Sequence, residues 1–321
     1  MKILGLSCGR RMGNTEVLVK EGLMGAQELG AEVELVRLND LKLKPCTGCN
    51  RCFEDVFTKG GSGSCILKND DFPFIDEKIL DCDGLVLGSP IYEKTPPGQL
   101  KILNDRMGPS HDMAIRIVAN QLQQEGKVPK KKGLDPRSFK VRAASLIAVG
   151  GSEWDTLALP LMHLFVLSMQ TAVVDKVLFN WVALPGVVAF DDAKLKRARE
   201  SGRHLATTLT KPIEGAEYIG EPGLCPICHS KVVEIRESDK NYPAICGICG
   251  VRGTLDVVDG RVTFAVSDAD RPLSHVLLSG KFAHVDELNN VSLKPPANMD
   301  ELPGLLEKYK KYLPYSRPTR G

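Results

Sequence analysis

The fold of this chain is decided by its opening stretch, KILGLSCGRRMGNTEVLVKEGLMGAQEL (Lys2–Leu29). An apolar run breaks into a polar, glycine-containing loop and resumes with apolar residues at helical spacing, which predicts a strand, a loop and a helix. The unpaired backbone N–H groups of the helix's first turn, together with the aligned peptide dipoles, favour an anion there. The side chains suited to complete a phosphate cradle are Ser7, Arg10, Asn14 and Thr15. An ordinary strand-to-helix turn, capped by Asn14 or Thr15, is the alternative.

Strands and helices continue to alternate along the chain. Further buried or half-buried strands are predicted at residues 31–38, 84–89, 143–149 and 171–179. Helices are predicted at about residues 70–80, 98–107, 111–126, 155–169 and 191–209. Because parallel strands need crossover connections, this order predicts an α/β fold, a doubly wound parallel five-stranded sheet with helices on both faces. Ligands of such sheets bind beyond the carboxyl ends of the strands, here the loops at 7–15, 89–98 and 150–153.

The composition of the chain argues against a nucleic-acid-binding or membrane-spanning protein. The 321 residues are 43% hydrophobic, and 42 Lys and Arg against 40 Asp and Glu leave a net charge of +2. This balance lacks the basic footprint of nucleic-acid-binding proteins, and no apolar run approaches the roughly 18 residues of a membrane span. The chain also enters a strand without a leader pattern. We therefore expect a cytoplasmic protein with no nucleic-acid or membrane partner, whose clustered thiols are metal ligands rather than disulfides.

The later cysteine group consists of two CxxC pairs, CPIC and CGIC. Its thiols are those of Cys225, Cys228, Cys246 and Cys249. A turn-forming position follows each pair, as is typical of zinc ribbons. Four thiolates fill a tetrahedron, so zinc here is structural and holds a small domain, residues 220–267, whose own core is too small. Rubredoxin-type iron is the alternative. Residues 255–266, centred on Asp259 and Gly260, predict the closing hairpin of this domain.

The earlier cysteine group lies in PCTGCNRCFEDVFTKGGSGSC (residues 45–65), a stretch so rich in Cys, Gly and polar residues that we predict no regular structure. Its thiols are those of Cys46, Cys49, Cys52 and Cys65. Three thiolates at CxxCxxC spacing ligate three corners of a cubane, and a fourth from the GGSGS loop completes a [4Fe-4S] site. A redox-active thiol set or purely structural cysteines are the alternatives. The two remaining cysteines, Cys8 and Cys82, are expected to be buried.

Three motifs together resemble a known family. They are SCGRRMGNT, GSPIYEKTPPGQLKILNDR and the Gly150-Gly151 loop, and they resemble the NADPH-dependent FMN reductases of the flavodoxin-like superfamily. The Cys46–Cys65 group is similar to that of the iron-sulfur flavoprotein branch. The likeness covers roughly residues 1 to 210 and implies a flavodoxin-like fold. The family commonly has a glycine and a second aromatic residue after the tyrosine, where this chain has Glu93 and Lys94.

The resemblance also implies site residues. The FMN phosphate would be held by Ser7, Arg10, Asn14 and Thr15. The isoalloxazine would be lined by Pro90, Ile91 and Tyr92, with Gly150 and Gly151 on its far side. Because flavin chemistry belongs to the cofactor, no separate catalytic residue is predicted. The family's homodimers or homotetramers, with the flavin near a subunit interface, imply a homo-oligomer.

The expected domain organisation has three parts. Residues 1–212 form the FMN-binding domain, residues 220–267 the zinc ribbon, and residues 268–321 a C-terminal extension ending in a helix at 299–312. An insertion at 111–142 ends in KVPKKKGLDPRSFKVR (residues 127–142), which has seven basic residues and one acid. Such a run is commonly a solvated loop. The alternative is a mobile lid beside an anionic ligand or the phosphates of NADPH.

These observations predict an FMN-dependent oxidoreductase. It would move electrons between NAD(P)H or a ferredoxin-like donor and an organic or protein acceptor, with the [4Fe-4S] cluster as an intermediate carrier. One alternative is a non-enzymatic flavin and iron-sulfur electron carrier between partner proteins, which would seldom need so much added chain. A second alternative makes the ribbon a protein-binding module.

Overall fold

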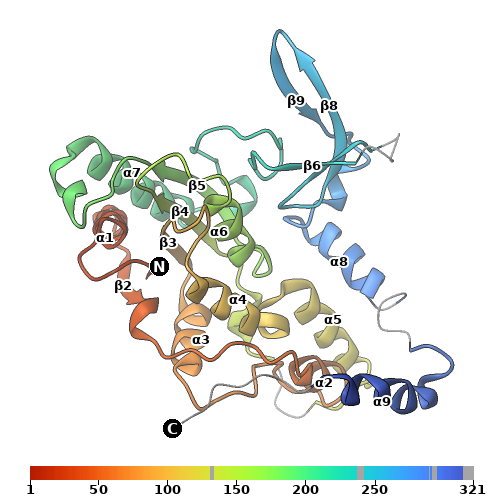
Figure 1. Ribbon diagram of the computed structural model, residues 1–321. Coiled ribbons are helices and arrows are strands. Elements are labelled where there is room, and N and C mark those ends of the chain that lie inside the picture. Colours follow the sequence, from red (N-terminus) through yellow and green to blue (C-terminus); the bar gives the residue numbers. More distant parts are fainter. Residues whose placement is uncertain (131–133, 237–241, 289, 291–294, 314–321) are drawn as a thin grey trace. The chain divides into compact units, whose positions relative to one another are not determined.

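The computed structural model describes the chain except residues 131–133, 237–241, 289, 291–294 and 314–321. It divides into two compact units, Met1–Phe282 and Ala283–Gly321. The first unit holds a parallel sheet with its helices and a small antiparallel sheet (Figure 1). None of the helices in the described part of the chain is long and apolar enough to cross a membrane.

The parallel sheet has five strands, as the sequence predicts. They are β1 (Lys2–Ser7), β2 (Glu32–Arg37), β3 (Gly84–Pro90), β4 (Ala143–Val149) and β5 (Ala172–Phe179), in the order β2-β1-β3-β4-β5. Every neighbouring pair is parallel. This is the flavodoxin-like order, and its strand sequence changes direction between β1 and β3, where ligands of such folds bind.

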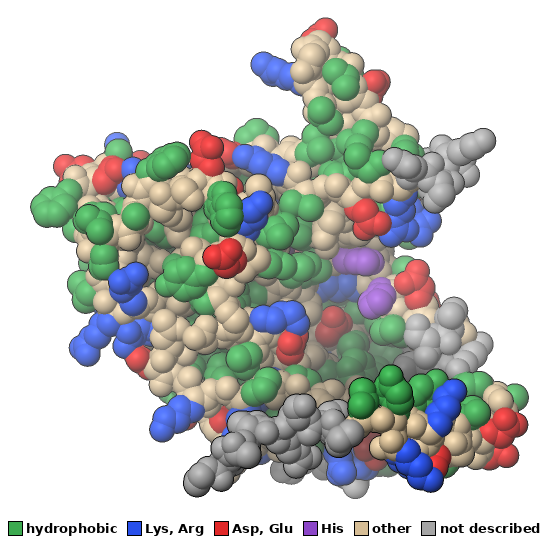
Figure 2. All heavy atoms as spheres, viewed as in Figure 1, with side chains coloured by type: hydrophobic (Ala, Val, Ile, Leu, Met, Phe, Trp, Pro, Cys, Tyr) green, Lys and Arg blue, Asp and Glu red, His purple; other side chains and the backbone are tan. Residues whose placement is uncertain are grey.

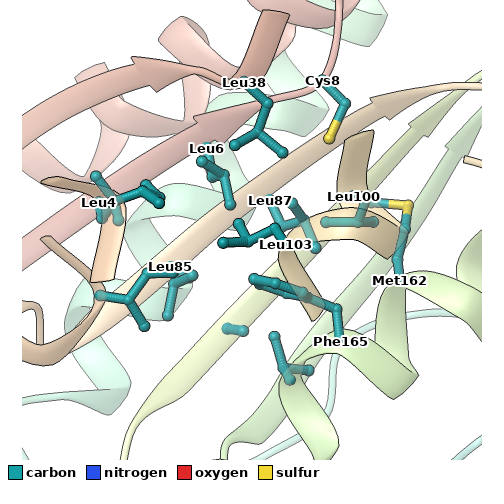
Figure 3. Packing of buried hydrophobic residues seen from close by; sticks show 14 of the residues in the cluster. Leu4, Leu6, Cys8, Leu38, Leu85, Leu87, Leu100, Leu103, Met162 and Phe165 are labelled. Carbon is teal, nitrogen blue, oxygen red and sulfur yellow. The ribbon is translucent and has the colours of Figure 1, made fainter. Parts of the chain in front are cut away.

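Helices cover both faces of the sheet. One face packs against α1 (Asn14–Gln27) and α7 (Asp192–Thr208), and the other against α3 (Phe72–Asp81), α4 (Gly98–His111) and α6 (Ala158–Leu167). Successive strand side chains point to opposite faces. Leu85 and Leu87 therefore enter one core with Leu103 and Phe165 (Figure 3), whereas Val86 enters the core beneath α1 and α7. The apolar strand runs bury both faces of the sheet.

Two helices near the cysteine stretch differ from expectation. The chain forms α2 (Arg51–Phe57) inside the stretch that we predicted to be irregular. Its Val56 is fully buried, so packing overrides a local composition that disfavours regular structure. The predicted helix at 111–126 begins after a kink at Gly108, as α5 (Met113–Gln124), with the Asp112 side chain accepting a hydrogen bond from the Ile115 N–H.

The smaller sheet of the first unit is antiparallel. Its strands are β6 (Val233–Ile235), β7 (Ala244–Cys246), β8 (Arg252–Val258) and β9 (Arg261–Ala265). The β8–β9 hairpin projects from the body of the unit (Figure 1) and turns at Asp259 and Gly260, both with positive φ, as predicted. Helix α8 (Leu278–Glu287) follows.

The remaining elements are short. Single 3₁₀ turns lie at Leu38–Asp40, Pro136–Phe139, Val187–Phe190, Ile213–Gly215 and Arg271–Leu273. In the second unit the predicted terminal helix is present as a 3₁₀ turn, Met299–Glu301, and α9 (Leu302–Tyr312). The apolar residues of α9, Leu302, Leu305, Leu306 and Tyr309, are all exposed.

Candidate functional site

The predicted ligand loops meet at one edge of the sheet because parallel strands end at the same side. Backbone hydrogen bonds join the loop starts in series: the Cys8 N–H donates to Gly88 O, the Ile91 N–H to Val149 O and the Gly150 N–H to Phe179 O, each at 2.9 Å. The loops after β1, β3, β4 and β5 therefore form a continuous rim. The fourth of these, after β5, was not among the loops that the sequence analysis selected.

The first loop forms a tight turn below the N-terminus of α1. Gly13 is the N-cap residue, and no side chain caps the helix, so the first-turn N–H groups face outward without a side-chain partner. Ser7 is fully buried, and its Oγ accepts a hydrogen bond from the Gly9 N–H at 3.2 Å. A Cβ on Gly9 would lie 2.8 Å from the Cβ of Thr15. This uncapped and closely packed turn fits the phosphate of FMN.

Two of the predicted phosphate residues differ in how their side chains are used. Arg10 is exposed. Asn14 is buried, and its amide nitrogen donates to Val182 O at 3.0 Å and Leu184 O at 2.7 Å, while its amide oxygen accepts from the Val188 N–H at 3.1 Å. Asn14 thus ties the loop after β5 to the start of α1.

The loop after β5 adds residues that the sequence analysis missed. Trp181 is 70% exposed with a positive φ, and Leu184 is 68% exposed. The available signal was the run FNWVALPG directly after the last predicted strand, at the same sheet edge as the other loops. These exposed apolar side chains widen the rim on the side of α1.

The loop after β3 contains a tight reverse turn. Tyr92 and Thr95 exchange backbone hydrogen bonds of 2.9 and 3.0 Å around Glu93 and Lys94, which both have positive φ. Tyr92 is about half exposed, and the ammonium of Lys94 lies 5.4 Å from the ring centre of Trp154. Glu93 and Lys94 therefore form the turn where the family commonly has a glycine and an aromatic residue.

The loop after β4 packs against the loop after β3. A Cβ on Gly150 would lie 3.2 Å from Cδ1 of Ile91 and 2.9 Å from Oδ1 of Asn180. A Cβ on Gly151 would lie 3.2 Å from that of Ala183. The loops after β3 and β4 thus lie side by side at Ile91 and Gly150, and Pro90, Tyr92 and Gly151 are their neighbours in sequence.

The earlier cysteines lie in and around α2. Cys46 and Cys49 are exposed, while Cys52 and Cys65 are half-buried. The Arg51 N–H and the Thr47 side chain hold the pKa of the Cys49 thiol below its usual range. Burial raises the pKa of Cys52, and the charges of Cys65 and Cys49 add to this increase. In the described part of the chain these four predicted ligands do not form a group close enough to share one metal ion, unlike the later cysteines.

A buried arginine on α4, which sequence reasoning missed, holds this cysteine stretch. Arg106 is 3% exposed, and its Nε donates to Sγ of Cys65 at 3.4 Å. The same guanidinium pairs with Asp70 and donates to the carbonyls of Lys44 and Leu67. The helical pattern around Arg106 does not indicate that its side chain points inward to a loop.

The four later cysteines form a compact thiol set, and no other described His, Cys, Asp or Glu residues form one. All four are buried, and their Sγ atoms lie within 4.8 Å of one another. Cys225 and Cys249 Sγ are 3.7 Å apart, and Cys228 and Cys246 Sγ are 3.4 Å apart. A tetrahedral zinc with Zn–S bonds of about 2.3 Å places its sulfurs about 3.8 Å apart. The thiol set fits a single four-coordinate metal ion.

The two CxxC pairs have the same local geometry. The fourth residue after each first cysteine, His229 or Gly250, has positive φ and donates its N–H to that cysteine's carbonyl at 3.0 Å. The N–H of each first cysteine in turn donates at 2.9 Å to the carbonyl five residues on, that of Ser230 or Val251. The two knuckles therefore present their thiols in equivalent ways to one centre.

The chain is similar to several known proteins. The family model for NADPH-dependent FMN reductase matches residues 1–183. A flavone synthase from Aspergillus candidus is 32% identical over 90% of this chain and 88% of its own length. A solved flavone reductase superposes with a TM-score of 0.84 and 31% identity, covering 99% of this chain and all of its own. An iron-sulfur flavoprotein from Methanocaldococcus jannaschii is 42% identical over 34% of this chain and 53% of its own length.

Proposed function

Because this chain belongs to the NADPH-dependent FMN reductase family, and is thereby a flavin oxidoreductase, we propose that it uses electrons from NAD(P)H to reduce a planar aromatic compound. The observation that carries the flavin assignment is the uncapped N-terminus of α1 above the tight Ser7–Thr15 turn. A helix N-terminus of this kind binds phosphate without further charged groups.

In this proposal the chain's residues divide the work of holding FMN. The first-turn N–H groups of α1, the hydroxyls of Ser7 and Thr15 and the exposed guanidinium of Arg10 bind the phosphate. Asn14 contributes through its position, since its side chain holds the loop after β5. The ring rests against Pro90, Ile91 and Tyr92 on one side and Gly150 and Gly151 on the other.

FMN, when bound, supplies hydride transfer at its N5 atom. The chain's own contribution is to hold the two reactants in contact and to exclude water from between them. The exposed rings of Tyr92, Trp154 and Trp181 offer flat apolar surface at the rim for an aromatic substrate.

We propose the substrate class from two similar proteins, which are named flavone synthase and flavone reductase. A flavone has a carbon–carbon double bond conjugated to a ketone, and its reduction takes one hydride and one proton. A planar aromatic ketone of this type fits a rim lined by aromatic side chains. The likeness extends over nearly the whole chain, the ribbon region included, which supports a shared reaction class.

We propose two metal centres. A [4Fe-4S] cluster would be held by Cys46, Cys49, Cys52 and Cys65, supported by the CxxCxxC spacing and by the similarity to an iron-sulfur flavoprotein over 34% of this chain. A structural zinc would be held by Cys225, Cys228, Cys246 and Cys249, supported by the sulfur spacing and the closed, buried coordination sphere.

A homo-oligomer is part of the same proposal. Exposed apolar side chains gather beyond the carboxyl ends of the strands, among them Trp154, Trp181 and Leu184. A second copy covering this surface would also shield the flavin from water.

The test is anaerobic purification followed by an absorption spectrum and by FMN, iron, sulfide and zinc analysis. We expect flavin bands with a broad cluster shoulder, about four irons and about one zinc per chain. NADPH oxidation is then measured with and without flavone. Flavone-dependent turnover supports the reductase, whereas rapid exchange of electrons with a protein carrier and none with flavone would favour the electron carrier. Absence of FMN after reconstitution would overturn the assignment of the loop.

A further inference from the structure

The loop after β3 contains a backbone turn that its residues do not readily adopt. Its two central residues, Glu93 and Lys94, have φ of 48° and 70°, and the Thr95 N–H donates to the carbonyl of Tyr92 at 3.0 Å. This is the pattern of a type I′ turn, whose central positions are usually Asn, Asp or Gly because positive φ is unfavourable for longer side chains. Such a turn beside a ligand site indicates that the direction of these two side chains matters there.

The turn brings Lys94 to the neighbouring loop. Its ammonium lies 5.4 Å from the centre of the Trp154 ring, which is within the range of a cation–π contact. Trp154 belongs to the loop after β4, and the starts of the two loops are joined by the hydrogen bond of 2.9 Å from the Ile91 N–H to Val149 O. The contact between Lys94 and Trp154 therefore joins the outer parts of the two loops that would border the flavin ring.

The ammonium of Lys94 is available to a ligand. Lys94 is exposed, and among the described residues it forms no ion pair and no hydrogen bond. Three acids are adjacent in sequence to Lys94 or Trp154. Glu93 and Glu153 are exposed, and Asp155 accepts a hydrogen bond from the Asn180 amide nitrogen. Because the indole face attracts the charge without accepting conventional hydrogen bonds, the three N–H groups of the ammonium remain free to donate.

Lys94 is separate from the cations of the phosphate turn. Arg10 and Arg11 follow β1, whereas Lys94 follows the neighbouring strand β3. In the proposed function the FMN phosphate lies at the N-terminus of α1, and the flavin ring lies against the loops after β3 and β4. Lys94 therefore belongs to the ring end of the site, with the exposed rings of Tyr92 and Trp154. A cation beside flat apolar surface favours a planar ligand that carries a negatively charged oxygen.

We propose that Lys94 is a specificity-determining residue, which donates a hydrogen bond to an anionic oxygen of an aromatic compound whose rings lie against Trp154. This inference rests on the proposed function, because the compound is the aromatic substrate that the oxidoreductase reduces at the rim. The oxygen belongs to an ionised phenol or a carboxylate of the substrate. Compounds that carry such a group are selected over neutral compounds of the same shape.

The test is a binding titration of the FMN-saturated full chain without NAD(P)H, so that no turnover occurs. The probes are 7-hydroxyflavone and 4′-hydroxyflavone, whose phenols lie at opposite ends of the molecule, and their methyl ethers, which cannot ionise. Each is titrated below and above the ionisation of the phenol, which its own absorption band reports. For at least one phenol we expect the ionised form to bind about fivefold more tightly than the methyl ether. This preference should disappear in Lys94→Met.

Lys94→Arg and Glu93→Gln are the matched variants. Lys94→Arg keeps the charge and should keep the preference. Glu93→Gln alters the same turn but removes a neighbouring negative charge, so it should maintain or increase the preference. An undiminished preference in Lys94→Met would overturn the proposal. An equal loss in Lys94→Met and Glu93→Gln would also overturn it, because the effect would then come from the shape of the turn. The FMN content of each variant is measured separately.

Two further measurements distinguish this inference from the proposed function. If the methyl ethers bind and are reduced by NADPH but no phenol is preferred, the assignment of Lys94 fails and the reductase stands. If neither the phenols nor the ethers bind, the proposed function fails and this inference fails with it. The affinity for NADPH, from the rate of FMN reduction without flavone, should be equal in Lys94→Met and the unmodified chain. A loss confined to NADPH would place a coenzyme phosphate at Lys94 and overturn the proposal.

Discussion

The Nε atom of Arg106 donates a hydrogen bond to Sγ of Cys65, at 3.4 Å, across 41 residues of sequence. The guanidinium also pairs with Asp70, and both side chains are almost completely shielded from solvent, at 0% and 2% exposed. It donates as well to backbone carbonyls on either side of the cysteines, those of Lys44 and Leu67. The helix α4 thereby holds both ends of the stretch that carries the first thiol group.

Arg106→Leu is therefore expected to destabilise the protein by about 3 to 5 kcal/mol, because it leaves the Asp70 carboxylate buried without its partner. The free energy of unfolding is measured by denaturant titration. Lys101→Ala is the control, since Lys101 forms an ion pair with Asp105 on the exposed side of the same helix and should change stability little. Equal effects of the two substitutions would contradict the anchoring role of Arg106.

Gly9→Ala is expected to weaken FMN binding at least tenfold. Its new Cβ would lie 2.8 Å from the Cβ of Thr15, which is too close, so the loop must move away from the start of α1. Gly98→Ala is the matched control, because a Cβ at Gly98 meets no atom within 4 Å. The affinity is measured from the quenching of FMN fluorescence. Equal affinities in the two variants would contradict the position of the phosphate turn.

Lys281 makes stability depend on pH. Its Nζ donates to the carbonyls of Leu167 and Ser168 at the end of α6, and burial lowers its pKa to about 8 from the ordinary 10.5. Between these two values the unfolded chain binds more protons than the folded one, so the free energy of unfolding rises with pH. The contribution between pH 8 and 10.5 is about 3 kcal/mol.

The measurement is the free energy of unfolding of the wild type and of Lys281→Met across this pH range. We expect the rise to be present in the wild type and reduced in the variant. Lys196→Met serves as the control, since the side chain of Lys196 is 76% exposed. A reduction of equal size in the control would show that Lys281 is not the titrating group.

The rate of alkylation should differ between exposed and buried cysteines. Burial raises the pKa of Cys8 to about 12 and that of Cys82 to about 11, whereas Cys49 is exposed with a lowered pKa. Because the thiolate is the reactive form, iodoacetamide at pH 8 should label Cys49 before Cys8 and Cys82 in protein that contains zinc but no iron-sulfur cluster. Peptide mass spectrometry follows the reaction, and labelling of Cys8 at the rate of Cys49 would contradict the structure.

On the face shown in Figure 2, basic and acidic side chains are interspersed with apolar ones. This distribution agrees with the net charge of +2 and offers no extended patch of one sign on that face. The charged groups with the clearest structural roles, Arg106 and Lys281, are instead buried.

Local patterns were sufficient for the sheet and the ribbon. Runs such as LVLG in β3 and AASLIAV in β4 are buried on both faces and predict strands without further context, because strand burial follows directly from residue type. The paired CxxC spacing likewise brings four thiols together, since each knuckle closes within six residues by the same backbone hydrogen bonds.

The sequence by itself therefore determined the positions of the five strands, the turn at the start of α1 and the second thiol set. All three depend on contacts within a few residues. Only the tertiary structure decided the use of Asn14 as a tie to the loop after β5, the inward direction of Arg106, the helix α2 and the contact between Lys94 and Trp154. These features join segments tens to more than a hundred residues apart. Their geometry comes from the packing of the sheet, the helices and the ribbon, which no local pattern encodes.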